Sequence, residues 1–137
     1  MTTLQQNLAK QAYSHVSAVK SEHKDNKTFQ QKYGTMALKL PILIRTAGLA
    51  QALAFVQARG SEAQNLLLEH LAVAAGIQGG DELARQSREE ELDAYIYLTN
   101  LVLAALVWYK RFSESVLKVS AADADAETEP AAAGIAD

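Results

Sequence analysis

Cysteine is absent from this chain, and its absence excludes several kinds of site at once. A chain without thiols forms no disulfide framework, no thiolate zinc site and no cysteine nucleophile. The three histidines, His15, His23 and His70, belong to no HExxH or Glu-x-x-His pattern, so we expect structural or exposed histidines rather than metal ligands. The serines lack a G-x-S-x-G elbow, and the glycine cluster at 76–80 lacks the lysine of a P-loop. The sequence therefore predicts no metal, no cofactor and no enzymatic activity.

Long hydrophobic runs are also missing. The best candidate, residues 94–109, is shorter than the roughly 20 apolar residues of a membrane span and carries Thr99 and Asn100 in its middle. We expect a buried helix there and no membrane contact. The N-terminal residues have neither the basic flank nor the apolar core of a signal peptide, which favours a cytoplasmic location.

Alternating apolar and polar residues, the mark of strands, are absent as well. Apolar residues instead recur three or four positions apart, as in Leu4, Leu8, Ala12, Val16 and Val19. This pattern predicts an all-α fold, a compact single-domain helical bundle of about five to six helices over residues 1–121. The expected helices cover about 3–22, 28–46, 49–58, 61–75 and a last long helix from 81 or 87 to 119. Residues 122–137 form an acidic, alanine-rich, low-complexity tail that we expect to be disordered.

Helix boundaries follow from capping residues. Thr3 with Gln6, and Ser61 with Gln64, have the spacing of a capping box. Thr28 and Asp81 are the expected caps of two further helices. The leucine-rich fourth helix is expected to bury Leu66, Leu67, Leu71 and Val73.

Three residues within 32–60 are unfavourable in a helix. Gly34 is expected to permit close packing, and Pro41 either starts a new helix or kinks the one that contains it. Gly48 is expected to end this helix as a left-handed cap.

Aromatic residues cluster in the most apolar part of the chain. Tyr95, Tyr97, Trp108, Tyr109 and Phe112 stand at helical spacing, which favours core packing over base stacking and places Trp108 in the core. Tyr13 and Tyr33, near the basic N-terminal third, are the better candidates for stacking on bases.

Acidic residues gather in one part of the chain. Residues 60–93 hold eight acidic residues against two basic ones. A carboxylate pair for acid–base chemistry could in principle come from Glu89, Glu90, Glu91 and Asp93, but adjacent helical positions point in different directions. We interpret them as a solvated helix start that matches the helix dipole.

Basic residues dominate the other end. Residues 1–45 hold seven basic residues against two acidic ones, and residues 32–60 include no acid at all. Such segregation indicates either contact with a polyanion or a merely solvated face. The candidate phosphate-binding residues are Lys24, Lys27, Lys32, Lys39, Arg45 and Arg59.

The segment KYGTMALKLPILIRTAGLAQALAFVQARG, residues 32–60, resembles the signature of a known family, the small all-helical subunit of the type III-B CRISPR (Cmr) RNA-guided effector complex. The matching motifs are Lys32-Tyr33-Gly34, Leu40-Pro41 before Leu43-Ile44-Arg45, Gly48-Leu49, and the run 52–55 through Gly60. The likeness extends over roughly residues 5–119 and does not include the tail.

This resemblance implies a non-catalytic role in antiviral defence. In that family, copies of the small subunit stack into a minor filament beside the backbone subunits, and a large polymerase-like subunit caps one end. Guide and target RNA lie between the filaments. The implied partners are therefore other copies of this chain, those subunits and the RNA. Two alternatives remain open: a helical adaptor that binds only protein, and an enzyme whose site is completed by partners.

Overall fold

The computed structural model describes residues 2–123. Within them the chain forms helices and no strand, in agreement with the expected all-α class. A further short helical stretch begins at residue 121, so the helices are slightly more numerous than expected. Most of the predicted tail, residues 124–137, lies outside the described residues. The six main helices are α1 (Leu4–Glu22), α2 (Lys27–Ala47), α3 (Leu49–Arg59), α4 (Glu62–Ala74), α5 (Gly80–Glu89) and α6 (Leu92–Ser115).

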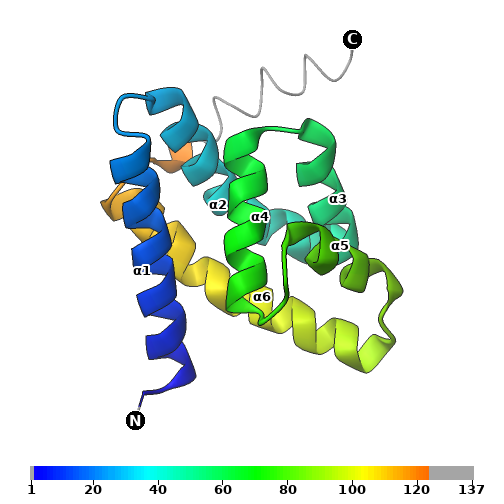
Figure 1. Ribbon diagram of the computed structural model, residues 1–137. Helices are drawn as coiled ribbons and strands as arrows, with labels where there is room; N and C mark the ends of the chain where they lie inside the picture. Colours follow the sequence, from blue (N-terminus) through cyan, green and yellow to red (C-terminus); the bar gives the residue numbers. More distant parts are fainter. Residues whose placement is uncertain (1, 124–137) are drawn as a thin grey trace.

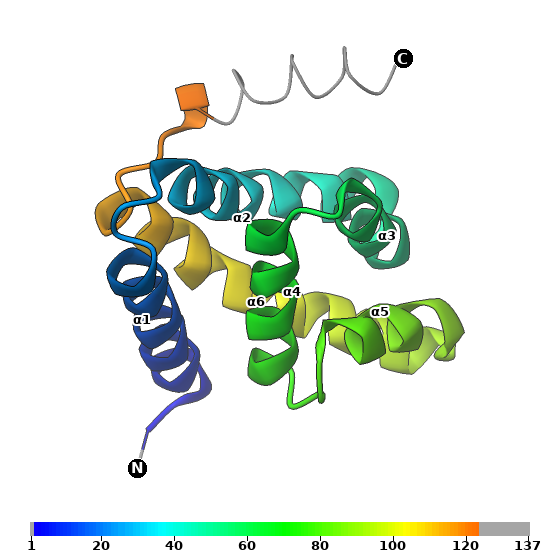
Figure 2. The same ribbon diagram turned by 45° about the horizontal axis from the view of Figure 1, so that its top comes forward.

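The long helix α6 organises the bundle. It packs against both α1 and α2, and α4 contacts α1, α2, α5 and α6. Figure 2 shows α2 and α6 running lengthwise with α4 crossing them. The shorter helices α3 and α5 lie together at one end, and α1 lies at the other (Figure 1).

The first helix begins as its capping residues predict. The Thr3 hydroxyl accepts a hydrogen bond from the Gln6 amide at 3.0 Å, and the Thr3 amide donates to the Gln6 side chain at 2.9 Å. Leu8, Ala12 and the valines that follow are buried, but Leu4 is exposed. The expected inner face of α1 is therefore one turn shorter than the pattern suggests.

The second helix runs through its proline. The cap is Asn26, whose side chain accepts from the Phe29 amide at 3.0 Å, so the expectation for Thr28 was wrong. Pro41 lies inside α2, which continues to Ala47 without a new helix start. Gly34 allows close packing as expected: a Cβ there would lie 2.5 Å from Cγ2 of Val119.

Gly48 separates α2 from α3 with a positive φ of 91°, but its ψ of 159° is not that of the left-handed helical cap that we expected. Gly60, which ends α3 at φ 69° and ψ 10°, has that conformation.

The fourth helix keeps half of its expected capping box. The Ser61 hydroxyl accepts from the Gln64 amide at 3.5 Å, whereas the Gln64 side-chain oxygen is buried without a partner in the described part of the chain. Leu67 and Leu71 are buried, but Val73 is exposed, contrary to the expected inner face.

The expected last long helix is two helices. Gly79, not Asp81, precedes α5, and the chain leaves helical geometry at Glu90 (φ −74°, ψ 151°) before Glu91 precedes α6. This break lets α5 lie against α3 and α4 while α6 turns toward α1 and α2. The new helix also ends at Ser115, before Lys118.

The core contains Tyr33 and Tyr109 rather than Trp108. Both tyrosines are fully buried, whereas Trp108 is half-buried and donates its indole N–H to Oε1 of Gln5 at 2.8 Å. Tyr97, also expected inside, is exposed.

One helix in the described part of the chain, α6, is long and apolar enough to cross a membrane by length and composition. Its most apolar window has a mean hydropathy of 1.4, and only 28% of that window is buried. One such helix is weak evidence for a span, and α6 packs along α1 and α2. The expected buried helix is thus buried on its inner side only.

Candidate nucleic-acid interface

The candidate basic residues follow α2 but do not share one face of it. Lys32 and Lys39 are seven residues apart, two helical turns, and therefore point the same way. Lys27 and Arg45 are five turns apart and share a different side. Along the axis, these two lie about 27 Å from each other at 1.5 Å per residue. The helix thus carries basic residues on two different sides rather than on one.

The N-terminal end of α2 gathers further positive charge. Lys24 lies in the turn before α2 and is exposed, as is Lys27. Lys27 and Lys118 line one groove, together with Asp123, where the chain after α6 passes the start of α2. Lys118 has a positive φ of 60°, unusual for a residue with a side chain. The candidate residues chosen from the sequence did not include Lys118.

Arg45, near the other end of α2, faces α6. It lines a groove of about 310 Å³ with Lys110 and Arg111 of α6, and Pro41 and Val107 contribute apolar walls. Neither Lys110 nor Arg111 was a candidate, because charge counting along the chain does not show which helices will lie side by side.

The last two candidates differ from the others. Arg59 ends α3, and its guanidinium carbon lies 5.5 Å from the centre of the Phe55 ring, a cation–π contact. Lys39 is half-buried. The remaining four, Lys24, Lys27, Lys32 and Arg45, are exposed.

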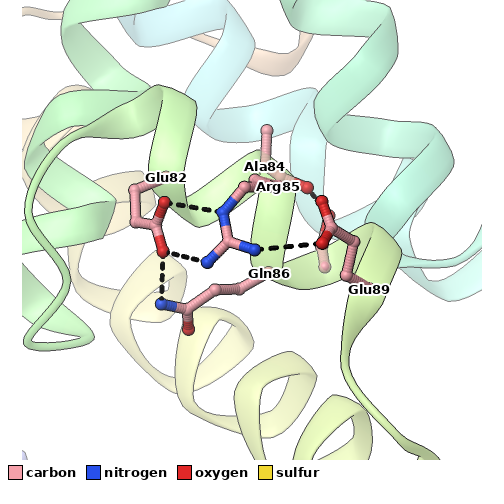
Figure 3. Close-up of polar contacts among 6 residues, drawn as sticks. Glu82, Ala84, Arg85, Gln86 and Glu89 are labelled. Carbon is pink, nitrogen blue, oxygen red and sulfur yellow. Dashed lines mark hydrogen bonds and ion pairs between the residues drawn. The ribbon is translucent and has the colours of Figure 1, made fainter.

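Within residues 2–123, the ion pairs are made by Arg85, which bonds Glu82 and Glu89 on α5. Figure 3 shows the Arg85 guanidinium between the two carboxylates, with Gln86 donating to Glu82 as well. Hydrogen bonds from Arg85 and then Gln86 lower the pKa of Glu82 to about 2. The carboxylates of Glu82 and Glu89 are therefore paired with a basic residue of their own helix. In the same described part, no carboxylate forms an ion pair with the four exposed candidates, which leaves their charge available to a polyanion.

A partly buried polar cluster joins four helices. His15 of α1 and His70 of α4 stack with ring centres 3.9 Å apart. The Tyr109 hydroxyl lies 2.6 Å from Nδ1 of His15, and the Tyr33 hydroxyl lies 2.6 Å from Nδ1 of His70. The Tyr109 hydroxyl also donates to the His70 carbonyl at 3.3 Å. Sequence reasoning treated these histidines singly, since nothing in their spacing shows that they stack.

Burial controls the protonation of this cluster. It lowers the pKa of His15, and burial followed by the nearby His15 lowers the pKa of His70 to about 3. Burial and Tyr109 raise the pKa of Tyr33 well above its ordinary value, and burial also raises that of Tyr109. All four groups are therefore neutral near pH 7, and the two half-buried histidines are hydrogen-bonded to the two buried tyrosines.

The described surface offers chemistry for binding anions. Among the described residues, no three histidine or carboxylate side chains stand close enough to hold a metal ion. Glu90 and Glu91 lie in the break between helices and Asp93 in the first turn of α6, all exposed. What the surface presents is fixed positive charge along α2 and beside α6, which suits phosphate groups.

Comparison with known proteins agrees with the fold and with the resemblance seen in the sequence. The family described as CRISPR-associated protein (Cas_Cmr5) matches residues 4–116. A Thermus thermophilus protein named CRISPR system Cmr subunit Cmr5 is 45% identical over 119 residues, which cover 86% of this chain and 99% of the relative. The crystal structure of a CRISPR-associated Cmr5 family protein from Thermus thermophilus matches with a TM-score of 0.74 and 46% identity, covering 85% of this chain and 98% of that one. Since the family match spans α1 to α6 and the relative aligns almost end to end, the chain belongs to the Cmr5 family of CRISPR-associated proteins.

Proposed function

We propose that this protein is the small subunit of a type III-B CRISPR (Cmr) effector complex in the cytoplasm, acting in antiviral defence. The observation that carries the assignment is the nearly end-to-end similarity to a protein named as a Cmr subunit. Its partners are the other subunits of the complex, including the large polymerase-like and backbone subunits. Copies of the chain stack as a minor filament that helps to hold the guide and target RNA.

The proposed RNA contact runs along α2. Lys24, Lys27 and Lys32 are exposed at its start, and Arg45 is exposed near its end. Lys39 and Arg59 complete the candidate set, and Lys118 joins it through the groove that it shares with Lys27. Lysines on a long helix follow phosphates without reading bases, so the contact is indifferent to target sequence beyond guide pairing.

The subunit itself is proposed to be non-catalytic. The exposed carboxylates Glu90, Glu91 and Asp93 do not converge, and the stacked histidines are half-buried, neutral groups. Purified protein should cleave neither RNA nor DNA, with or without divalent metal. Metal-dependent cleavage that co-purifies with the chain and disappears in Glu90→Ala would contradict this role.

The test of the RNA contact is a charge reversal in the assembled complex. Lys27→Glu with Lys32→Glu should weaken target RNA binding and flatten its dependence on salt, since each phosphate contact to a single strand adds about 0.7 to the logarithmic slope. Lys10→Glu is the matched control, because Lys10 is also exposed but lies on α1, outside the candidate set. Both variants should fold, and both should enter the complex.

The alternative function is a protein-only helical adaptor, which the exposed apolar side of α6 favours. It predicts that the double reversal leaves both affinity and salt slope at the values of the Lys10→Glu control. Under that outcome the basic residues of α2 are solvated, and the subunit is a spacer between proteins.

A further inference from the structure

The outer side of α6 is an apolar stripe in contact with solvent. Ile96 is 47% exposed, Tyr97 69% and Val107 40%. Val107 also borders the groove between α6 and α2. Asn100 and Leu103 lie between them at helical spacing. Protein surfaces rarely leave such a stripe uncovered unless a partner binds there.

The two ends of this stripe carry opposite charge. Asp93 lies at the N-terminal end, directly after Glu90 and Glu91 in the break between α5 and α6. Lys110 and Arg111 lie at the C-terminal end, where Arg45 of α2 borders the same groove. Glu114 lines this groove too, so three basic residues stand there against one acidic residue. None of these residues forms an ion pair within residues 2–123, in contrast to Glu82 and Glu89, which Arg85 neutralises (Figure 3).

A surface that is acidic at one end, apolar in the middle and basic at the other is complementary to itself when turned around. We propose that α6 binds α6 of a second copy of this chain in antiparallel orientation, about a two-fold axis near residues 101–102. Every contact then occurs twice, as in any two-fold interface. This symmetric pairing goes beyond the proposed function, because a two-fold contact closes on itself, whereas a head-to-tail stack does not.

The register follows from the positions along the helix. With the axis near residues 101–102, Ile96 of one copy lies opposite Val107 of the other, and Asn100 lies opposite Leu103. Asp93 then faces Lys110 and Arg111 of the second copy. The helix dipoles are also antiparallel, which places the positive end of each helix beside the negative end of the other. Helices that pack in this way are about 8–10 Å apart, close enough for the side chains on the stripe to interlock.

A lipid bilayer is the other environment that would cover an apolar helix. The inner side of α6 argues against a bilayer, because Tyr109 and Leu106 are fully buried against neighbouring helices. The charged residues Lys110 and Arg111 also follow Tyr109 directly in the sequence. The charges at the two ends of the stripe also match a second α6, whereas the interior of a bilayer offers them no partner.

The experiment is sedimentation velocity on the purified full chain over a wide range of concentrations. The parent protein should show a monomer–dimer equilibrium. Val107→Glu should weaken the dimer about tenfold or more, since it places two carboxylates in the apolar centre of the pair. Val73→Glu is the matched control: Val73 is 51% exposed and belongs to α4 rather than α6, so its substitution should leave the equilibrium unchanged.

Charge exchange tests the orientation. Asp93→Lys alone, or Lys110→Glu with Arg111→Glu alone, should weaken the dimer, and combining all three changes should restore it. The chain has no cysteine, so Asn100→Cys introduces a single thiol close to the axis. Mild oxidation should link this variant into a disulfide dimer, whereas Val73→Cys should stay unlinked.

Several results would overturn the proposal. They are a chain that stays monomeric at every concentration, an open-ended series of oligomers, and a dimer that tolerates Val107→Glu. Failure of the triple charge exchange to restore the dimer would exclude the antiparallel register. Flotation of the monomer with phosphatidylcholine vesicles, abolished by Val107→Glu, would assign the stripe to a membrane instead.

Discussion

The stacked histidines make the stability of this fold sensitive to mild acid. In the folded protein the pKa of His70 is about 3, and in the unfolded chain it returns to the ordinary value of about 6.5. The unfolded state therefore binds more protons between these values, and the free energy of unfolding falls as the pH drops below about 6.5. For His70 alone, the loss at about pH 5 is about 2 kcal/mol relative to neutral pH. The lowered pKa of His15 changes stability in the same direction.

The assay is urea unfolding at about pH 7.5 and about pH 5, a window in which ordinary carboxylates remain mostly charged. His70→Gln removes the titrating group, so its loss of stability between the two values should be smaller than that of the parent by about 2 kcal/mol. Tyr33→Phe is the control: it deletes the hydroxyl beside His70 and lowers stability at both pH values, but it keeps both histidines and thus most of the pH dependence. An acid-induced loss that is as large in His70→Gln as in the parent would refute the reasoning.

Two further substitutions test the packing. Gly34→Ala should cost about 1–3 kcal/mol, because the new methyl group meets Cγ2 of Val119, and a second change, Val119→Ala, should recover part of this in urea unfolding. Tyr109→Ala should cost about 3–5 kcal/mol, as for other large buried aromatic residues, and Trp108→Ala should cost clearly less. Equal melting temperatures for the two aromatic variants would contradict the observed burial.

Local signals in the sequence predict the start of the first helix and two of the glycine turns. Thr3 with Gln6 forms its capping box because both groups are near neighbours in the chain. Gly48 and Gly60 adopt positive φ where the apolar runs stop. These features depend on a few adjacent residues, so no knowledge of the packing is needed to find them.

The break at Glu90 and Glu91 could not be predicted in the same way. Neither residue opposes helix formation, and no glycine or proline marks the site. The chain bends there because α5 buries Leu83 and Ala84 against its own neighbours, while α6 packs on α1 and α2. The periodicity of apolar residues therefore predicted one helix where the structure has two, since it does not show which neighbouring helices each segment packs against.

Burial of the aromatic residues shows a similar limit. Trp108 and Tyr109 are adjacent in an apolar helix, and only their angle around its axis decides which one is buried. Tyr33 lies in a basic segment, which made it a candidate for base stacking, but its hydroxyl meets His70 in the core. The same limit applies to the candidate interface. Charge counts along the sequence are enough to select Lys24, Lys27 and Lys32. Lys118 could not be selected in this way, because only the packing of the chain brings it beside Lys27.

Arg45 lies where the proposed RNA-binding surface and the proposed pairing surface meet. It belongs to the basic residues of α2, and it borders the groove that contains Lys110 and Arg111 of α6. Arg45→Glu should therefore weaken both target RNA binding by the complex and pairing of the free chain. Lys27→Glu should affect RNA binding alone, and Val107→Glu should affect pairing alone, since each lies at only one of the surfaces. Salt-dependent RNA titration and sedimentation of the same three variants measure both effects. If Arg45→Glu alters neither property while the other two variants behave as expected, Arg45 belongs to neither surface.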